Sequence, residues 1–141
     1  MRYSTVVVPE QRIAPRFGAG TLSELTFAYS PATDFAFIYD GAPVEGYSDE
    51  FEDNWLLRIE EASHQVRGVE SLAFTESLAR LPAIASAVEP AIAEIEAYLG
   101  RSLRDGECQV VATVDEFPAL FRCYVYLVGY GIGRIAELDA A

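Results

Sequence analysis

The chain contains no lysine, so all ten of its basic residues are arginines. They stand against 22 Asp and Glu residues, which leaves a formal net charge of −12. Binding to nucleic acids and to anionic membranes depends on basic side chains that neutralise phosphates. A surface this acidic argues against both as partners. It is compatible with a basic protein, a cationic ligand or a metal ion, or with an acid excess that only maintains solubility.

Side chains that bind transition metals are scarce, because the chain has one His and two Cys. Alone these residues cannot complete a four-ligand transition-metal site, so we expect no metal and no other cofactor. Long apolar runs are lacking too. The run at residues 6–8 is too short for a signal peptide, and the richest stretch, residues 124–132, contains glycines and falls short of a membrane span. We therefore expect no membrane contact and a cytoplasmic location, with Cys108 and Cys123 as free thiols.

Apolar residues are plentiful, at 51% of 141 residues. A chain of this size buries enough surface to form a core without disulfides or metals. Length and composition therefore predict one domain over residues 1–141.

A short run of valines predicts a first strand at residues 6–8, and apolar patterns bounded by turn residues predict strands at residues 25–29, 35–39, 55–59 and 66–70. The last four form a predicted antiparallel meander. Residues 40–54, which are polar and carry Gly41, Pro43 and Gly46, are predicted to be a connection.

The second half of the chain predicts a helix and a closing hairpin. Apolar residues recur at helical spacing, and Gly100 is a natural helix end; the positions are Ile84, Val88, Ile92, Ile95 and Leu99. Pro90 predicts either a kink or two helices. Residues 108–114 and 120–128 are predicted to pair as a hairpin. The expected fold is α+β, a mostly antiparallel sheet of five to seven strands with one main helix or a kinked helix pair on one face.

Three stretches carry a resemblance to a known family: YSPATDFAFI at residues 29–38, DNWLLRI at 53–59 and VRGVESL at 66–72. In order and spacing they resemble the bacterial domain-of-unknown-function family 2283 over roughly residues 26–77. Residues 78–141 lie outside the match. The resemblance implies a β-meander and no catalytic residues, since no activity is established for that family.

His64 is a candidate general base, with Ser63 and Glu60 beside it. The alternative is an exposed turn histidine, and the sequence has no G-x-S-x-G elbow to hold a serine nucleophile. We assign no catalytic residue, so the sequence leaves enzymatic activity undecided and leans against it.

Five acids form a candidate partner-binding surface: Glu45, Asp49, Glu50, Glu52 and Asp53. They offer hard oxygen ligands, but the run lacks the central glycine of a calcium-binding EF-hand loop. We expect a solvated acidic loop that a basic protein can recognise.

Five other residues are candidate ligand-binding residues for a pocket between helix and sheet, in which arginines clamp a carboxylate or phosphate: Arg58, Arg67, Arg122, Tyr124 and Tyr126. The alternative is that the strand arginines pair with nearby acids such as Glu60 and Glu70.

Two further patterns are weaker. GIGRIA at residues 131–136 matches a dinucleotide-binding motif, but the chain ends before the second strand that this motif needs; these glycines are expected to end the last strand. Cys108 and Cys123 lie on the two arms of the predicted hairpin, where they either form a redox pair or are buried thiols.

Together these features favour a non-enzymatic protein-interaction or regulatory module, for example antitoxin-like, with a basic protein partner. An aromatic last strand with Tyr124, Tyr126 and Tyr130 on one face adds a homodimer to this hypothesis. The alternatives are a small-molecule-binding protein or enzyme, and a structural subunit of a larger or phage-derived assembly.

Overall fold

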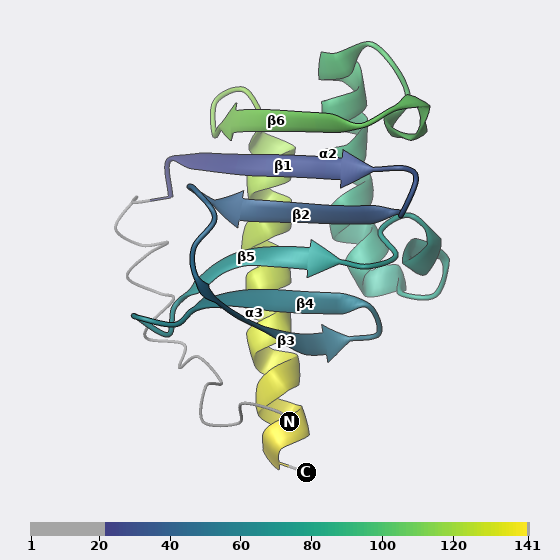
Figure 1. Ribbon diagram of the computed structural model, residues 1–141. Helices are drawn as coiled ribbons and strands as arrows, with labels where there is room; N and C mark the ends of the chain where they lie inside the picture. Colours follow the sequence, from purple (N-terminus) through teal and green to yellow (C-terminus); the bar gives the residue numbers. More distant parts are fainter. Residues whose placement is uncertain (1–21, 141) are drawn as a thin grey trace.

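A six-stranded antiparallel sheet with two helices behind it forms the fold, so the predicted α+β class is confirmed (Figure 1). The computed structural model describes residues 22–140, and the predicted strand at residues 6–8 lies outside this range. The strands are β1 (Glu24–Ser30), β2 (Phe35–Asp40), β3 (Gly46–Glu52), β4 (Trp55–Glu60), β5 (Val66–Ser71) and β6 (Cys108–Thr113). The helices are α2 (Pro82–Leu99) and α3 (Pro118–Ala140), with short 3₁₀ turns η2 (Glu76–Ala79) and η3 (Leu103–Asp105).

The order of the strands differs from a simple meander. It runs β3-β4-β5-β2-β1-β6, so β2 pairs with β5 and not with β4. The chain leaves β2, crosses to the far edge as β3, and returns through β4 and β5. All four strands of the predicted meander therefore exist, as does the strand predicted at residues 108–114, which is β6. The third and fourth strands of the meander lie in the opposite spatial order from the one expected.

Strand β3 was predicted to be part of a polar connection. Its sequence, GYSDEFE, has low β-propensity because acids and glycine dominate it. It forms a strand because β4 offers a free edge, with Tyr47 opposite Ile59 and Asp49 opposite Leu57. A charged edge strand is also the usual protection against unwanted pairing.

Helix α2 is a single helix that continues through Pro90, so it is not divided into two. Pro90 is exposed, while Ile84, Val88 and Ile95 are buried. Packing of this apolar stripe compensates for the hydrogen bond that proline cannot make. The helix ends at Gly100, whose φ of 71° is left-handed, as predicted.

The predicted hairpin is wrong in its second arm, because residues 120–128 belong to helix α3. Aromatic and β-branched residues suggested a strand there, yet the buried positions Leu120, Tyr124, Leu127 and Gly131 recur at steps of four, three and four. Residues 131–136 are likewise helical, so the glycine motif does not follow a strand. Cys108 lies in β6 and Cys123 in α3, both as free thiols.

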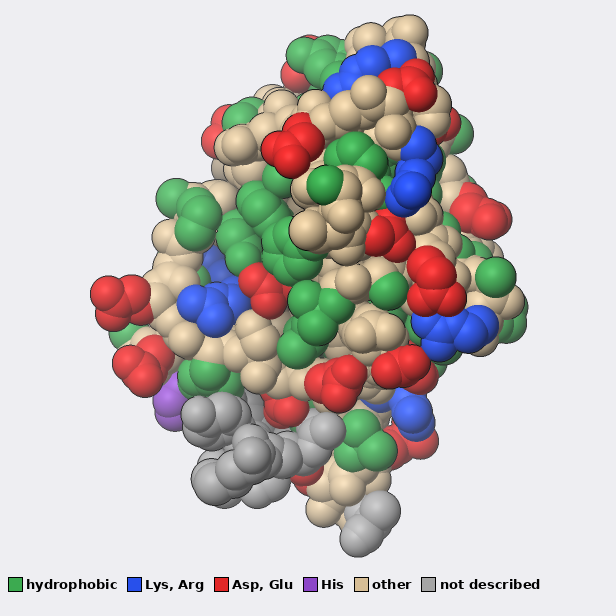
Figure 2. Space-filling view, turned by 45° about the vertical axis from the view of Figure 1, so that its right-hand side comes forward, with side chains coloured by type: hydrophobic (Ala, Val, Ile, Leu, Met, Phe, Trp, Pro, Cys, Tyr) green, Lys and Arg blue, Asp and Glu red, His purple; other side chains and the backbone are tan. Residues whose placement is uncertain are grey.

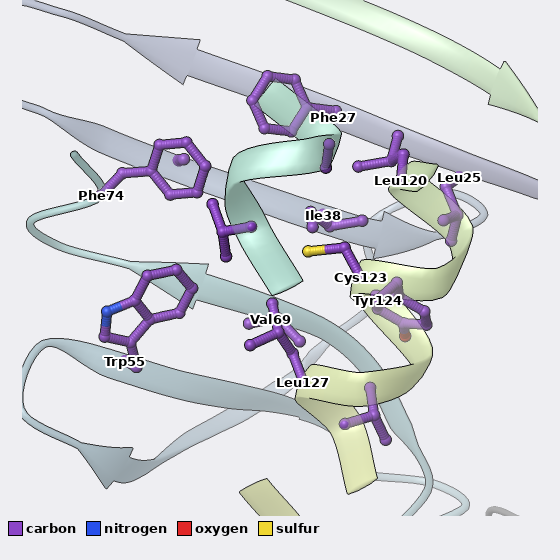
Figure 3. Packing of buried hydrophobic residues seen from close by; sticks show 14 of the residues in the cluster. Leu25, Phe27, Ile38, Trp55, Val69, Phe74, Leu120, Cys123, Tyr124 and Leu127 are labelled. Atoms are coloured by element: carbon purple, nitrogen blue, oxygen red, sulfur yellow. The ribbon is translucent and has the colours of Figure 1, made fainter. Parts of the chain in front are cut away.

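The core fills the space between the sheet and the two helices (Figure 3). Trp55 lies at one end of it, in contact with Phe74 at 5.8 Å between ring centroids. Its indole N–H donates to the Ser77 hydroxyl at 2.8 Å, so the largest core side chain leaves no polar atom unbonded. Both helices pack on this one side of the sheet.

Candidate functional site

The other side of the sheet carries no described helix, and we call it the open face (Figure 1). Strand residues alternate between the core and this face, as the burial patterns show. The outward side chains include Glu24, Thr26, Ala28 and Ser30 on β1; Phe35, Phe37 and Tyr39 on β2; Ser48 and Glu50 on β3; Leu56, Arg58 and Glu60 on β4; Glu70 on β5; and Gln109, Val111 and Thr113 on β6.

An aromatic row along β2 runs through the middle of the open face. The rings of Phe37 and Tyr39 stack with centroids 4.2 Å apart, and those of Phe35 and Phe37 lie 6.2 Å apart. Tyr39 lies over Gly68 of β5, where a Cβ would come within 2.2 Å of the ring. Glycine at position 68 therefore lets the ring lie close against the sheet.

The polar groups beside this row are bonded within the chain. The Tyr39 hydroxyl donates to Glu70 at 2.5 Å, and Ser48 donates to the other oxygen of the same carboxylate at 2.9 Å. Burial and the hydrogen bond to Glu70 raise the pKa of Tyr39, so its hydroxyl stays protonated. The ring is thereby held in one orientation.

A hollow of about 360 Å³ lies beside the aromatic row. Phe35 and Phe37 form one wall, Gln109 the other, and the small side chains of Ala28 and Ser30 lie between them. Tyr29, Glu107 and Cys108 complete its lining. The open face thus has a ridge of aromatic side chains on β2 next to a groove over β1.

Figure 2 shows this side of the molecule obliquely, with hydrophobic side chains gathered over the middle of the sheet and acidic side chains spread around them. Preorganised aromatic side chains that stay partly exposed are typical of binding surfaces. The open face is therefore the candidate functional site.

The five residues predicted to line one pocket do not come together. Arg58 and Arg67 lie on the sheet, whereas Arg122 and Tyr126 are exposed on α3 and Tyr124 is buried in the core. Arg58 donates to the Val44 carbonyl at 3.3 Å. Arg67 bonds Glu60 at 3.3 Å and the Asp40 carbonyl at 3.1 Å. The alternative reading, in which strand arginines pair locally, holds for Arg67.

Arg122 and Tyr126 line a second hollow, of about 500 Å³, on the helix layer. Its other walls are apolar, from Leu22, Val114, Pro118, Phe121 and Val125. Among residues 22–140, Arg122 has no hydrogen-bond or ion-pair partner. This hollow opens to solvent beside α3 and not between helix and sheet.

The acidic run is divided by the alternation of β3. Asp49 is buried, and Glu50 is exposed and accepts the Asn54 backbone N–H at 3.0 Å. Glu52 accepts from Tyr130 at 2.7 Å and Arg134 at 3.1 Å, both on α3. Asp53 pairs with Arg80 at 3.1 Å. Glu45 precedes the strand, so the five acids do not form one continuous surface.

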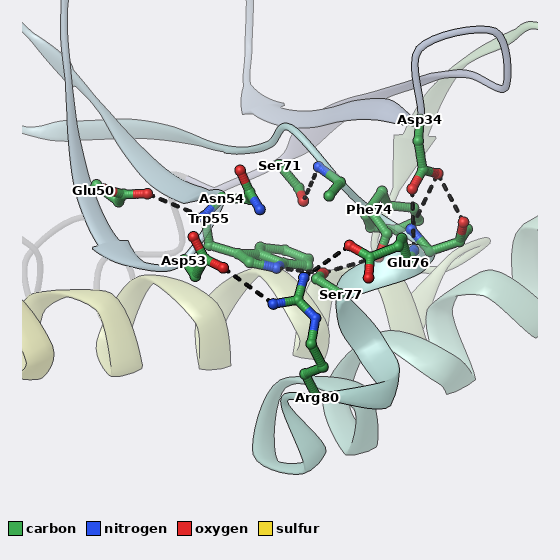
Figure 4. A network of polar contacts seen from close by, with 12 residues as sticks. Asp34, Glu50, Asp53, Asn54, Trp55, Ser71, Phe74, Glu76, Ser77 and Arg80 are labelled. Carbon is green, nitrogen blue, oxygen red and sulfur yellow. Dashed lines mark hydrogen bonds and ion pairs between the residues drawn. The ribbon is translucent and has the colours of Figure 1, made fainter.

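Turns that are distant in sequence meet at one end of the sheet (Figure 4). Asp34, in the turn between β1 and β2, accepts hydrogen bonds from Thr75 Oγ1 at 2.7 Å and from the Glu76 backbone at 3.1 Å. Arg80 bonds both Asp53 and Glu76. These contacts tie the 3₁₀ turn η2 to the sheet, and we interpret them as structural.

His64 lies in the turn between β4 and β5, exposed and with a φ of 59°. The neighbouring Ser63 hydroxyl donates to Glu60 at 2.6 Å. Burial raises the pKa of the Cys123 thiol to about 12, and burial also raises that of Cys108, so neither thiol is activated. Within residues 22–140, no three His, Cys, Asp or Glu side chains are grouped to hold a metal ion.

The open face was not among the predicted sites. A signal was present, because FAFIY at residues 35–39 is apolar at every position, which indicates a strand with two apolar faces.

None of the helices in the described part of the chain is long and apolar enough to cross a membrane. The chain matches no protein-family model, no curated protein and no solved structure.

Proposed function

We propose that this chain is a non-enzymatic protein-interaction module, with a regulatory role, that docks its partner on the open face. The observation that carries this is the aromatic row on β2, left uncovered by both helices and held in place by Gly68 and Glu70. A preorganised apolar surface loses little conformational entropy when it binds. A distant relationship of β1–β5 to family 2283 and a cytoplasmic location belong to the same proposal.

Docking through the open face differs from the acidic-loop hypothesis in its salt dependence. Attraction between an acidic loop and a basic protein weakens as salt shortens the Debye length. Apolar contact on the aromatic row does not weaken in this way. The five acids do not form one continuous surface, so we favour docking through apolar contact on the open face over docking through the acidic loop.

The test is capture of partners from the native lysate by three immobilised proteins: wild type, Phe37→Arg and Leu138→Arg. Phe37→Arg places a charge in the aromatic row, whereas Leu138 is an exposed apolar residue on α3, outside both hollows, and is the matched control. We expect proteins retained by wild type and Leu138→Arg to be lost with Phe37→Arg, and to remain bound in about 0.5 M salt. Retention by Phe37→Arg, or release by salt alone, would contradict docking on this face.

The second candidate function is small-molecule binding in the hollow beside α3. It is favoured by Arg122, which no described residue pairs with, among apolar walls of a volume suited to small ligands. Such a site fits an apolar carboxylate. Calorimetric titration with short-chain fatty acids and aromatic acids tests it, since binding should be lost in Arg122→Gln and kept in Arg101→Gln.

A further inference from the structure

We infer that the occupant of the open face is a second copy of this chain, so that the protein is a dimer with its two sheets packed face to face. This inference rests on the proposed function of the open face and names its partner. Three features of the face favour a copy of itself: its relief, its size and its distribution of charge.

The relief of the open face is self-complementary. The aromatic ridge of Phe35, Phe37 and Tyr39 lies directly beside the groove floored by Ala28 and Ser30. A twofold axis between ridge and groove places the ridge of each copy in the groove of the other. Such isologous contacts are the commonest interfaces of soluble homo-oligomers, and packed sheets interdigitate in this way.

The size of the open face is sufficient for a weak dimer. Six strands spaced about 4.8 Å apart, each about 20 Å long, give a footprint of roughly 580 Å² per copy. The two copies together then bury roughly 1,200 Å², which is the lower limit for specific interfaces. We therefore expect a dimer that dissociates on dilution.

The distribution of charge leaves this face as the favourable approach between two copies. Each chain has a net charge of −12, so most orientations bring acidic surfaces together. On the open face, the outward side chains of β2, β1 and β6 are uncharged except for Glu24 at the start of β1. The charged side chains on β4 and β5 are already bonded within the chain: Arg58 to a backbone carbonyl, Arg67 to Glu60, and Glu70 to Tyr39 and Ser48. Contact over the open face therefore meets uncharged side chains on β2, β1 and β6, and on β4 and β5 it meets charges that already have partners within the chain.

The experiment is sedimentation velocity on the full chain from about 1 to about 100 µM, a range suited to an interface of this size. We expect a species of twice the 15.5-kDa chain mass at the upper end and monomer at the lower end. Added salt should strengthen the dimer by screening repulsion between the copies. Phe37→Arg should weaken it at least about thirtyfold, the effect of losing one hot-spot side chain, while Leu138→Arg leaves it unchanged.

A second variant distinguishes loss of the dimer interface from a folding defect in Phe37→Arg. Ala28→Phe fills the groove without adding charge and should also give a monomer, with the circular dichroism spectrum of the wild type. A dimer that survives both variants is formed elsewhere and overturns the inference.

A wild-type monomer at every concentration overturns the second copy as occupant, and a fluorescent apolar dye then tests the open face itself. Dye binding to the monomer that is lost in Phe37→Arg leaves the face available for a different partner. If the monomer binds no dye there, the proposed docking function fails as well.

Discussion

Asp34 is the residue at which three separate segments of the chain are joined. Its carboxylate accepts hydrogen bonds from Tyr29 at 2.6 Å on β1 and from Thr75 at 2.7 Å before η2. Arg104 of η3 bonds it at 3.3 Å. Its φ of 57° is left-handed, a conformation that Asp and Asn tolerate better than most residues.

The pKa of Asp34 reflects this position. Partial burial alone would raise the pKa of the carboxyl, but the hydrogen bonds from Tyr29, Thr75 and the Glu76 backbone outweigh it and lower the pKa below 3.8. A lowered folded-state pKa means that the ionised carboxylate stabilises the fold above the unfolded-state pKa. This stabilisation is lost as the pH falls through the folded-state value.

We expect Asp34→Asn, which keeps the left-handed backbone, to reduce the free energy of unfolding by about 1–3 kcal/mol at pH 7, because it removes charge-assisted hydrogen bonds. The difference in the free energy of unfolding between Asp34→Asn and wild type should become smaller below about pH 4. Urea unfolding at pH 7 and pH 3 measures both values. Asp53→Asn, in an exposed ion pair, is the control and should cost less than about 1 kcal/mol. An equal loss for Asp34→Asn at both pH values would contradict this account.

At the scale of elements, helix α3 shows how close packing overrides local propensity. Three glycines occur within it, at positions 129, 131 and 133, although glycine disfavours helices. Gly131 faces β4, where a Cβ would come within 2.9 Å of Leu57, a fully buried residue. The helix lies this near the sheet because position 131 has no side chain.

The three glycines predict different outcomes on replacement by alanine. Gly129→Ala and Gly133→Ala meet no atom within 4 Å, so each should raise the free energy of unfolding by about 0.5–1 kcal/mol. Gly131→Ala should lower it, because overpacking against Leu57 costs about 1–3 kcal/mol and exceeds the gain in helix propensity. Urea unfolding of the three single variants tests this, and a common sign for all three would contradict it.

At the scale of the whole molecule, the excess of acid opposes the folded state. The chain has a net charge of −12, and folding brings its carboxylates into a small volume. The repulsion between them reduces the stability of the folded state. Several ion pairs among the described residues are exposed, such as Arg80 with Glu76 and Asp53, and exposed pairs contribute little.

We therefore expect added salt to stabilise the protein. Raising NaCl from about 0.05 to about 0.5 M should increase the Tm by a few degrees, since ~1 kcal/mol corresponds to about 2–4 °C for a chain of this size. Calorimetry on Phe37→Arg, the variant expected to be monomeric, separates this effect from dimerisation. A Tm that falls with salt would show that attractive ion pairs outweigh the repulsion.

The amino-acid sequence by itself determined the α+β class, strands β1, β2, β4, β5 and β6, and helix α2 with its end at Gly100. These depend on local features: apolar residues with a period of two or of 3.6, and turn residues such as Gly100 whose backbone preference is their own. For Arg67 it favoured a ligand clamp and left pairing with a nearby acid as the alternative, and the structure has the alternative.

Only the tertiary structure decided the strand order, the pairing of β3, the helical state of residues 118–140 and the open face. An acidic edge strand forms because a neighbour offers hydrogen bonds, and an aromatic, β-branched segment becomes a helix because its buried face fits the sheet. Which face of a sheet stays uncovered depends on where both helices pack, and this is a property of the assembled chain. The aromatic residues at 35–39 are evident in the sequence. Their exposure follows only from the position of α2 and α3 on the opposite side of the sheet.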